Sequence, residues 1–456
     1  MKPKLFGSSG VRSVVNVGFT PVLVSKIGLA IASSCKAKRV LMGRDTRVSG
    51  LMIEDALVAG LLSGGADVEC LGIVPTPVVA YLTGKLKVDA GVMITASHNP
   101  PQYNGLKIFD KSGLAYDEQS QDEIERIVED QNLESPNWRN IGQASSTDRG
   151  FLYLESVARE ITLNKNWNLV VDPGCGATYQ TAPDLLRKLG CKVMAINAQP
   201  DGFFPGRSPE PNRQSLNPLA RIVKDSNADL GVAFDGDGDR VAFIDEEGVF
   251  VDFDQILAAY AAFAIKKNCG GTIVTNVEAS MCVEKMVKTQ GGKVIRTKVG
   301  DVHVAQALKR HHAVFGGEPC GAWIHPQFHY CPDGVYSSIV LLKALEDEGV
   351  SLSDFVSETP KFQTLRENVP CQNESKHKII EGIKEALINC FPSYRHASTV
   401  DGLRLTLQYG WILARASGTE PLIRLTVEGE SLKRAEEIME TAIDIIKKRA
   451  IEETSK

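Results

Sequence analysis

The segment Ala90-Gly91-Val92-Met93-Ile94-Thr95-Ala96-Ser97-His98-Asn99-Pro100-Pro101 joins an apolar run directly to a polar loop. The apolar run, 90–94, predicts a buried strand of a sheet. Polar residues begin at Thr95, and the two prolines then end any regular structure. We call 95–101 the serine loop, because Ser97 is expected in a rigid turn at the end of the strand. A hydroxyl held there is well placed to act as a nucleophile or to carry a phosphoryl group.

Strand-like and helix-like segments alternate on both sides of the serine loop, which favours an α/β fold with repeated units. After Pro360 the pattern changes to an antiparallel meander and one amphipathic helix, whose apolar stripe runs from Leu432 to Ile446. The chain has 456 residues, so two to four domains are expected. The expected strands are 40–43, 68–73, 90–94, 169–172, 230–234, 241–244, 272–275, 294–297, 313–315, 401–407, 411–415 and 422–428, and the expected helices are 51–61, 185–189, 256–265, 277–289 and 335–345.

A second polar stretch, Asp235-Gly236-Asp237-Gly238-Asp239-Arg240, follows the expected strand 230–234, and we call it the acidic loop. Three carboxylates this close repel one another unless a cation lies among them. Three oxygen ligands and a vacant position suit Mg²⁺ bound beside a phosphate, which Arg240 would also neutralise. Because sites in such sheets lie beyond the carboxyl ends of the strands, we expect the serine and acidic loops to form one phosphoryl-transfer site.

The acidic loop also partly matches a calcium-binding loop, in which Glu246 would take the twelfth position. The sixth position of such a loop is glycine, whereas this chain has Arg240, and the flanking segments are typical of strands where an EF-hand has helices. A Ca²⁺-binding protein without enzymatic activity is the alternative from another class. A purely structural acidic turn is a second alternative.

Two further loops follow expected strands and carry polar groups. The arginine loop, 415–421, offers a cation, hydroxyl groups and backbone N–H groups to an anion, although an ordinary hairpin turn would look similar. Its candidate ligands are Arg415, Ser417, Gly418, Thr419 and, just beyond it, Arg424. In the glutamate loop, 316–321, Glu318 is an acceptor for sugar hydroxyl groups, and Cys320 is interpreted as a small packing residue.

Three more polar side chains are candidates for the same site. His98 can donate a hydrogen bond to a phosphate held on Ser97. Lys107 follows the serine loop closely and suits a general acid or base if it is partly desolvated; a solvated lysine is the alternative. The turn 6–12 is rich in glycine and serine and ends in Arg12. It is either a flexible N-terminal turn or a phosphate-facing loop.

Composition excludes several other classes of protein. The hydrophobic fraction of 43% and the charged fraction of 23% are ordinary for a globular protein. A net charge of -5 argues against a nucleic-acid partner. The N-terminal stretch 1–7 has no apolar core like that of a signal peptide, and the longest apolar run, 256–265, is too short to cross a bilayer, so no membrane partner is expected. Ten cysteines without a C-x-x-C pair suit free thiols in a reducing cytoplasm.

Taken in order, the stretches T-A-S-H-N-P, D-G-D-G-D-R, G-E-P-C-G and R-A-S-G-T-E-P resemble the four signature loops of the α-D-phosphohexomutase family. The resemblance extends over nearly the whole chain. It implies four domains around a central cleft, three of them similar mixed α/β units and the last a smaller α+β unit. With the changes of pattern as boundaries, the expected domains are 1–148, 149–252, 253–362 and 363–456.

The resemblance also implies a mechanism. Ser97 is expected to be a phosphoserine that gives its phosphoryl group to a sugar 1- or 6-phosphate. The resulting 1,6-bisphosphate turns round in the cleft and returns its other phosphoryl group, and free bisphosphate is the expected activator. The implied Mg²⁺ ligands are Asp235, Asp237, Asp239 and an oxygen on phosphorylated Ser97. The candidate catalytic residues are Ser97, His98, Lys107, Arg240 and Arg12, and the substrate-binding residues are Gly300, Asp301, Glu318, Cys320, Arg415, Ser417, Gly418, Thr419 and Arg424.

The substrate is expected from smaller details of the resemblance. Val299-Gly300-Asp301 resembles phosphoglucosamine mutases, whereas many phosphomannomutases and phosphoglucomutases have histidine after that glycine. Trp323-Ile324-His325-Pro326 resembles an archaeal branch that includes relatives acting on pentose phosphates, and Cys320 replaces the serine most common in the family. We therefore expect interconversion of glucosamine 6-phosphate and glucosamine 1-phosphate, with mannose, glucose or pentose phosphates as alternatives. The sequence leaves open whether the protein is a monomer or a homo-oligomer.

Overall fold

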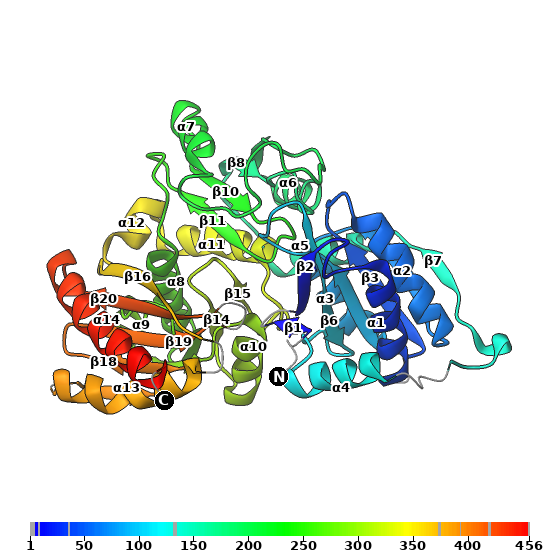
Figure 1. Cartoon of the computed structure of the whole chain (residues 1–456). Coiled ribbons are helices and arrows are strands. Elements are labelled where there is room, and N and C mark those ends of the chain that lie inside the picture. The colour runs from blue at the N-terminus through cyan, green and yellow to red at the C-terminus, as the bar shows by residue number, and fades with distance from the viewer. Residues whose placement is uncertain are drawn as a thin grey trace.

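The computed structural model describes residues 5–7, 10–34, 37–130, 135–372, 375–392, 394–417 and 421–454. In Figure 1 these residues form an N-terminal unit on the right, a second unit at the top, a third in the middle and a C-terminal unit on the left. Each unit is built around one sheet. The α/β fold class predicted from the sequence, with a different C-terminal unit, is confirmed.

The first unit contains a seven-stranded sheet in the order β1-β2-β6-β5-β3-β4-β7. Its strands are β1 (Phe6–Gly7), β2 (Gly10–Val14), β3 (Arg39–Arg44), β4 (Asp67–Ile73), β5 (Ala90–Ile94), β6 (Tyr103–Asp110) and β7 (Ala144–Ser146), and its helices are α1 (Pro21–Ser34), α2 (Gly50–Ser63), α3 (Thr76–Leu86) and α4 (Glu118–Glu129).

The predicted strand 90–94 is confirmed as β5, which is buried along its whole length. Val92 and Ile94 pack on the side of α1, α2 and α4, whereas Met93 packs on the side of α3. Because both faces of the strand are covered, apolar residues occupy every position instead of alternate ones. β5 pairs in parallel with β3, so the serine loop and the turn after β3 leave the sheet at the same edge.

The second and third units each contain a four-stranded sheet, in the orders β11-β10-β8-β9 and β13-β12-β14-β15. One hydrophobic cluster that includes Phe243, Leu257 and Trp323 continues from one unit into the other. The strands are β8 (Asn168–Asp172), β9 (Lys192–Ala195), β10 (Leu230–Phe234), β11 (Val241–Ile244), β12 (Thr272–Asn276), β13 (Lys293–Thr297), β14 (Phe315–Gly317) and β15 (Trp323–Ile324). The helices are α5 (Phe151–Glu160), α6 (Thr181–Lys188), α7 (Asn217–Asp225), α8 (Phe253–Lys267), α9 (Cys282–Thr289), α10 (Asp301–His311), α11 (Gly334–Glu348) and α12 (Leu352–Ser357).

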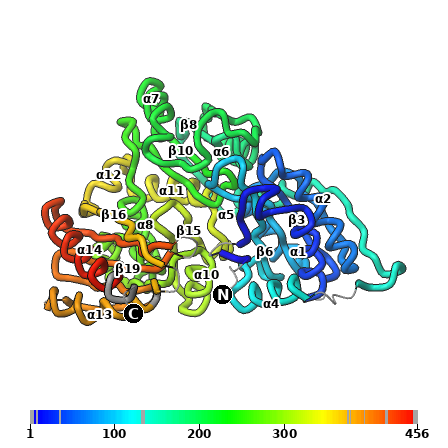
Figure 2. The backbone as a smooth tube through the Cα atoms, viewed as in Figure 1, coloured from blue at the N-terminus to red at the C-terminus, as the bar shows by residue number. Residues whose placement is uncertain are grey.

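The C-terminal unit is an antiparallel sheet in the order β16-β20-β19-β18-β17, packed against two helices. Its strands are β16 (Gln363–Pro370), β17 (His396–Ser398), β18 (Leu403–Thr406), β19 (Gly410–Ala416) and β20 (Leu422–Gly429), and its helices are α13 (Lys376–Cys390) and α14 (Leu432–Thr454). The tube in Figure 2 shows this unit beside the third unit and away from the first. Among the residues described, no helix has both the length and the apolar character needed to cross a bilayer.

Several predicted elements have wrong boundaries, and local hydrogen bonds explain two of the differences. The helix predicted over 277–289 begins only at Cys282, because Val277 N still donates to Thr297 O of β13 and the Asn276 side chain accepts from Glu278 N. The strand predicted at 313–315 begins at Phe315, because Ala313 N instead closes the end of α10 on Leu308 O. Local hydrogen bonds outside the regular pattern decide both boundaries.

Strand β6 was not among the predicted elements, although it is central in the first sheet. Its sequence contains Asn104, Gly105 and Lys107, which are poor strand formers by composition. The turn 135–143 contains only a short 3₁₀ helix, η1 (Trp138–Asn140). The turn predicted at 6–12 is in part a hairpin of β1 and β2, and Arg12 lies on β2.

Candidate active site

Ser97 lies where β5 ends, in a backbone conformation that is unusual for serine. Its φ angle is 51°, in the left-handed region. Ser97 N donates to Thr95 Oγ1 at 2.8 Å, and Ser97 Oγ donates to Asp235 Oδ2 at 2.7 Å. His98 Nδ1 lies 3.3 Å from the same hydroxyl. The serine loop of the first unit therefore meets the acidic loop of the second.

The acidic loop connects β10 to β11, which form an antiparallel pair. Asp235 Oδ1 accepts from Gly238 N at 3.0 Å and from Arg240 N at 3.2 Å, so the first aspartate fixes the turn. Gly238 has a φ angle of 74°, which glycine adopts without strain. Strands rather than helices flank the loop, so the EF-hand alternative lacks the two helices that enclose a calcium loop.

The three aspartates each present a carboxylate oxygen within 4.8 Å of the others, and all three side chains are buried. Asp237 Oδ1 and Asp239 Oδ1 have no hydrogen-bond partner among the residues that the structure describes. Such buried, unpaired oxygens are costly unless a ligand satisfies them. The cluster therefore fits a divalent cation.

Lys107 reaches this cluster from β6, with a side chain that is 5% exposed. Its Nζ donates to Asp237 Oδ2 at 2.7 Å and to Asp239 Oδ2. The lysine thus uses one oxygen of each carboxylate and leaves the other oxygen free for a metal ion. Thr76 Oγ1, from the first turn of α3, also donates to Asp237 Oδ2, at 2.5 Å.

Burial and neighbouring charges perturb the pKa values of the cluster. Burial raises the pKa of Asp235, and the Asp237 and Asp239 carboxylates raise it further. In Asp237 the effect of burial is outweighed by the Lys107 ammonium, which lowers the pKa. Burial works against the charged form of Lys107 too, but Asp237 and Asp239 raise its pKa above the ordinary value. An ion pair network of this kind keeps Lys107 protonated while no metal is bound.

Further cations surround the serine hydroxyl. Burial, followed by the charges of Arg240 and Arg12, lowers the pKa of His98 to about 2, so its imidazole is neutral near pH 7. Arg12 Nε is buried without a hydrogen-bond partner among the described residues. The two arginines and Lys107 make this part of the site favourable for a phosphate.

The glutamate loop lies beside the acidic loop. The backbones of Arg240 and Ala322 form a bridge, and Val241 N donates to Gly321 O at 3.1 Å. Glu318 is buried and accepts from Asn276 Nδ2 at 2.7 Å and from Gly300 N at 2.8 Å. The cluster of charges therefore continues from the three aspartates into the third unit.

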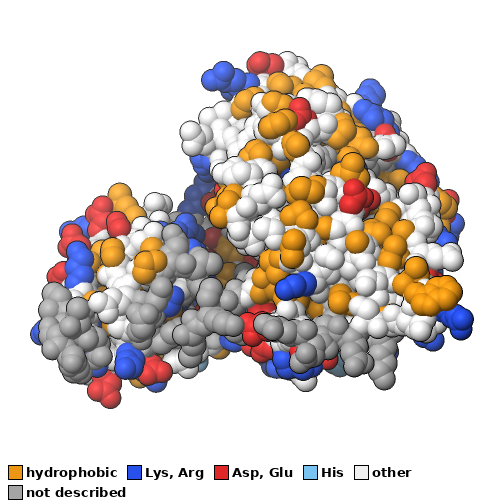
Figure 3. Space-filling view, turned by 45° about the vertical axis from the view of Figure 1, so that its right-hand side comes forward, with side chains coloured by type: hydrophobic (Ala, Val, Ile, Leu, Met, Phe, Trp, Pro, Cys, Tyr) orange, Lys and Arg blue, Asp and Glu red, His pale blue; other side chains and the backbone are white. Residues whose placement is uncertain are grey.

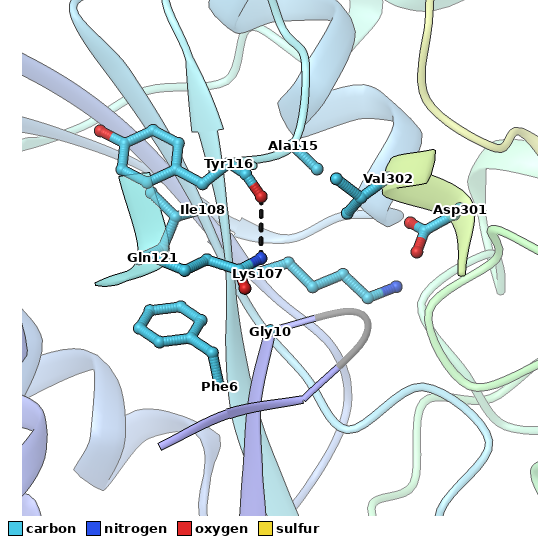
Figure 4. A pocket seen from close by; sticks show the side chains of 9 residues that line it. All are labelled: Phe6, Gly10, Lys107, Ile108, Ala115, Tyr116, Gln121, Asp301 and Val302. Atoms are coloured by element: carbon cyan, nitrogen blue, oxygen red, sulfur yellow. Dashed lines mark hydrogen bonds between the residues drawn. The ribbon is translucent and has the colours of Figure 1, made fainter. Parts of the chain in front are cut away.

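Asp301 and Cys320 complete this side of the site. Burial raises the pKa of Glu318, and the Asp301 carboxylate raises it further. Burial also raises the pKa of Cys320, to about 12, although Arg240 acts against it. Cys320 is therefore an uncharged thiol near pH 7. In Figure 4 the Lys107 side chain extends past the pocket that Gly10 and Tyr116 help to line, toward Asp301 at the start of α10.

The arginine loop lies at the junction of the C-terminal and third units. Arg415 contacts Glu278 at 2.8 Å and Asp401 at 3.3 Å, and Asp401 also accepts from Val299 N at 3.2 Å. Arg415 and Arg424 are register partners on β19 and β20, so two cationic side chains lie on neighbouring strands at the arginine loop. Ser417 is buried, while the predicted ligands Gly418 and Thr419 lie outside the described residues.

Sequence reasoning missed two polar residues that support this site. Thr76 orients Asp237, and Asn276 orients Glu318. Each lies at a strand end or a helix start, in Pro75-Thr76-Pro77 and at the end of β12. In the sequence, Thr76 and Asn276 could therefore be recognised only by their position beside a predicted strand end, because no motif contains them.

The chain is similar to known proteins in all four of its units. Models of the phosphoglucomutase/phosphomannomutase family match it in four parts: alpha/beta/alpha domain I over 3–135, domain II over 152–248, domain III over 252–362 and the C-terminal domain over 367–445. The chain therefore belongs to this family, the α-D-phosphohexomutases. It is a phosphohexomutase, an enzyme of the isomerase class.

Curated relatives are similar over nearly their whole length. A probable phosphoglucosamine mutase of Pyrococcus abyssi is 43% identical over 444 residues, which cover 97% of this chain and 98% of the relative. The phosphoglucosamine mutase of Methanocaldococcus jannaschii is 40% identical over 449 residues, with the same coverage of 97% and 98%.

Solved structures show the same architecture. A phosphoglucomutase/phosphomannomutase family protein from Burkholderia thailandensis superposes with a TM-score of 0.88 at 27% identity, covering 98% of this chain and 97% of the other. The Aspergillus fumigatus N-acetylphosphoglucosamine mutase, in complex with GlcNAc-6P and magnesium, gives a TM-score of 0.65 at 15% identity, covering 98% and 96%. At that identity the second likeness concerns the fold alone.

Proposed function

We propose that this phosphohexomutase interconverts glucosamine 6-phosphate and glucosamine 1-phosphate through a phosphoserine at Ser97 and a sugar 1,6-bisphosphate. The observation that carries the chemistry is the 2.7 Å contact between Ser97 Oγ and Asp235 Oδ2. In this contact the Ser97 hydroxyl lies beside a cluster of carboxylates that has two unpaired buried oxygens among the described residues. A phosphoryl group on that hydroxyl would lie against the proposed metal site.

Asp235, Asp237 and Asp239, with an oxygen of phosphorylated Ser97, are the residues that would hold Mg²⁺. When bound, this ion supplies Lewis-acid stabilisation of the charge on the phosphoryl oxygens. Arg240 and Arg12 add fixed positive charge on the same side of the serine hydroxyl. His98, which is neutral near pH 7, offers a hydrogen bond without adding charge.

In the first transfer, the bond between Ser97 Oγ and phosphorus breaks and a bond from the free sugar hydroxyl to phosphorus forms. The proton of that hydroxyl passes to a base, and in the return transfer an acid supplies it again. We assign this exchange to Lys107: its neutral amine accepts the proton, and its ammonium form, which the adjacent carboxylates favour, returns it. The bisphosphate turns round between the two transfers, so the arginine loop must hold either phosphate in turn.

Two observations support an amino sugar as the substrate. The curated relatives that are 40% and 43% identical over nearly the full chain carry the name phosphoglucosamine mutase. In addition, the Asp301 carboxylate lies close enough to Glu318 to raise the pKa of that carboxyl group, after burial. The amino group of glucosamine phosphate is a cation near neutral pH, and paired carboxylates favour a cation over a neutral hydroxyl.

A panel of sugar phosphates tests this proposal. Purified protein with Mg²⁺ and a catalytic amount of sugar 1,6-bisphosphate should show its highest kcat/KM with glucosamine phosphate, ahead of glucose, mannose and pentose phosphates. Asp301→Asn should reduce this preference for the amino sugar while the reaction with glucose phosphate changes less. Equal or better turnover of mannose, glucose or pentose phosphate by the unmodified protein would assign the enzyme to one of those substrates instead.

We further propose that the reaction takes place in the cytoplasm. All cysteines that the structure describes are free thiols, and several of them are buried. This state suits a reducing compartment.

A further inference from the structure

Arg47 lies beneath the serine loop and is 1% exposed. Its Nη2 donates to Ser97 O at 2.9 Å and to Asn99 O at 2.6 Å, and its Nη1 donates to Pro100 O at 2.6 Å and to Tyr103 O at 2.9 Å. One guanidinium thus binds four backbone carbonyl groups, three in the serine loop and one at the start of β6. The loop is held through its carbonyl groups, so the Ser97 hydroxyl is left to contact the acidic loop.

The fifth donor of the guanidinium completes a ring of contacts. Arg47 Nε donates to Asp45 Oδ2 at 3.0 Å, and the same oxygen accepts from Thr95 Oγ1 at 2.7 Å. Thr95 Oγ1 in turn accepts from Ser97 N at 2.8 Å. The Asp45 side chain is buried as well. Both the N–H and the carbonyl of Ser97 are therefore fixed by one buried Arg47–Asp45 pair.

The backbone of Ser97 requires such support. Its φ angle of 51° is in the left-handed region, which serine adopts only when its surroundings impose it. All five N–H groups of Arg47 are used, in a planar fork that an ammonium group with three donors does not reproduce. The shape of the guanidinium, as well as its charge, is needed to hold this turn.

The same turn also contacts the second unit, which carries the acidic loop. Thr46 Oγ1 donates to Cys175 O at 2.9 Å, and the Phe204 ring lies 5.3 Å from Arg47 Cζ. The turn 45–47 is therefore in contact with both sides of the interface across which Ser97 meets Asp235.

We infer that Arg47 is a positioning residue for phosphoryl transfer, which holds Ser97 Oγ in line with the acidic loop without touching the substrate. The inference rests on the proposed role of Ser97 as the phosphoryl carrier. Misplacement of a reacting atom by about 1 Å can cost about 100-fold in rate. A positioning role for Arg47 predicts a slower phosphoryl transfer rather than weaker sugar binding, since the glutamate loop and the arginine loop lie on other units.

The test compares Arg47→Lys with Arg296→Lys. Arg296 is a matched control, because it also uses all five donors, on Glu284 and on the carbonyls of Asn276, Ala279 and Ser280, but in the third unit. Each variant is incubated with saturating sugar 1,6-bisphosphate and Mg²⁺, and the rate of phosphoryl transfer to Ser97 is followed by mass spectrometry. kcat and KM for sugar phosphate and the thermal unfolding midpoint are measured in parallel.

Arg47→Lys should slow labelling of Ser97 and lower kcat by about 10- to 100-fold while KM changes less than threefold. In Arg296→Lys, Ser97 should be labelled at nearly the rate of the unmodified protein, and any loss of activity should appear in KM for the sugar phosphate. Equal labelling rates in Arg47→Lys and the unmodified protein, with only the unfolding midpoint lowered, would overturn the inference and leave Arg47 a structural residue. Failure of the unmodified protein to label at Ser97 would instead refute the proposed function.

Discussion

Ser97 Oγ lies 2.7 Å from Asp235 Oδ2, although 138 residues separate the two along the chain. The contact joins the end of β5 in the first unit to the end of β10 in the second. In the unphosphorylated protein the serine hydroxyl donates a hydrogen bond to this carboxylate. With a phosphoryl group on Ser97, negative oxygens would face three buried carboxylates, so a cation would be required between them.

Ser97→Ala should lower turnover by on the order of 10³-fold or more, because it removes the atom that carries the phosphoryl group. The measurement is kcat with sugar phosphate under saturating bisphosphate. Ser33→Ala, at an exposed position of α1, is the control and should leave kcat unchanged. Turnover of Ser97→Ala within tenfold of the unmodified protein would show that another residue carries the group.

Asp237→Asn should weaken Mg²⁺ binding, because the unpaired Oδ1 loses most of its charge. The loss of metal affinity should exceed the roughly 10–100-fold that removal of an outer hydrogen-bond partner costs. Titration of activity with Mg²⁺ measures the effect. Asp225→Asn, an exposed aspartate at the end of α7, is the matched control. An unchanged Mg²⁺ requirement in Asp237→Asn would exclude this side chain as a ligand.

Thr76→Val should weaken Mg²⁺ binding by about 10-fold, because Thr76 Oγ1 donates to Asp237 Oδ2 and so orients the carboxylate. Thr83→Val on the same helix removes a hydrogen bond to Val79 O, which lies within α3. Both variants should lower the unfolding midpoint, but only Thr76→Val should shift the Mg²⁺ titration. Parallel shifts in the two variants would indicate a general loss of structure in α3.

Glu346→Gln should destabilise the protein at neutral pH but not in acid. Glu346 accepts from the backbone N–H groups of Asn164 and Lys165, at 3.0 and 2.8 Å, and joins α11 to the second unit. Burial acts against its charged form, but these hydrogen bonds outweigh burial and lower the pKa of Glu346. The stabilisation is therefore complete above the pKa of about 4.3 that glutamate has in the unfolded chain, and is lost as the pH falls through the lower folded value.

The corresponding measurement is the unfolding midpoint of Glu346→Gln and the unmodified protein from pH 7 to pH 3. At pH 7 the variant should be less stable by about 1–3 kcal/mol, and the difference should shrink as the pH falls. Glu348 is on the same helix, α11, and forms a partly exposed ion pair with Lys266 of α8. Glu348→Gln, which breaks this pair, should therefore have a small effect at any pH. A difference that stays constant over this range would mean that packing, rather than the charge of Glu346, is responsible.

The sequence predicts the elements that periodicity and burial control. β5 and β10 are continuous apolar runs, and both were expected with their observed bounds. β6 could not be found in this way, because a buried position within it is occupied by Lys107. This lysine binds Asp237 of the acidic loop, 130 residues away. A functional side chain in a strand removes the local pattern that would reveal the strand.

The same limit applies to the site. The serine and acidic loops could be predicted because each follows the carboxyl end of a buried strand, where sites in such folds lie. The roles of Thr76 and Arg47 could not, because each acts through a contact with a residue far away in the sequence, Asp237 and Asn99 among them. Such contacts depend on how units pack, which periodicity does not report.

Phosphopeptide mapping of the unmodified protein tests the central claim most directly. The protein is incubated with glucosamine 1,6-bisphosphate and Mg²⁺, digested, and analysed by mass spectrometry before and after addition of glucosamine 6-phosphate. We predict one phosphoryl group on Ser97, which disappears when the sugar phosphate is added and is recovered as bisphosphate. A phosphoryl group on another residue, or none that the sugar phosphate can remove, would contradict the account.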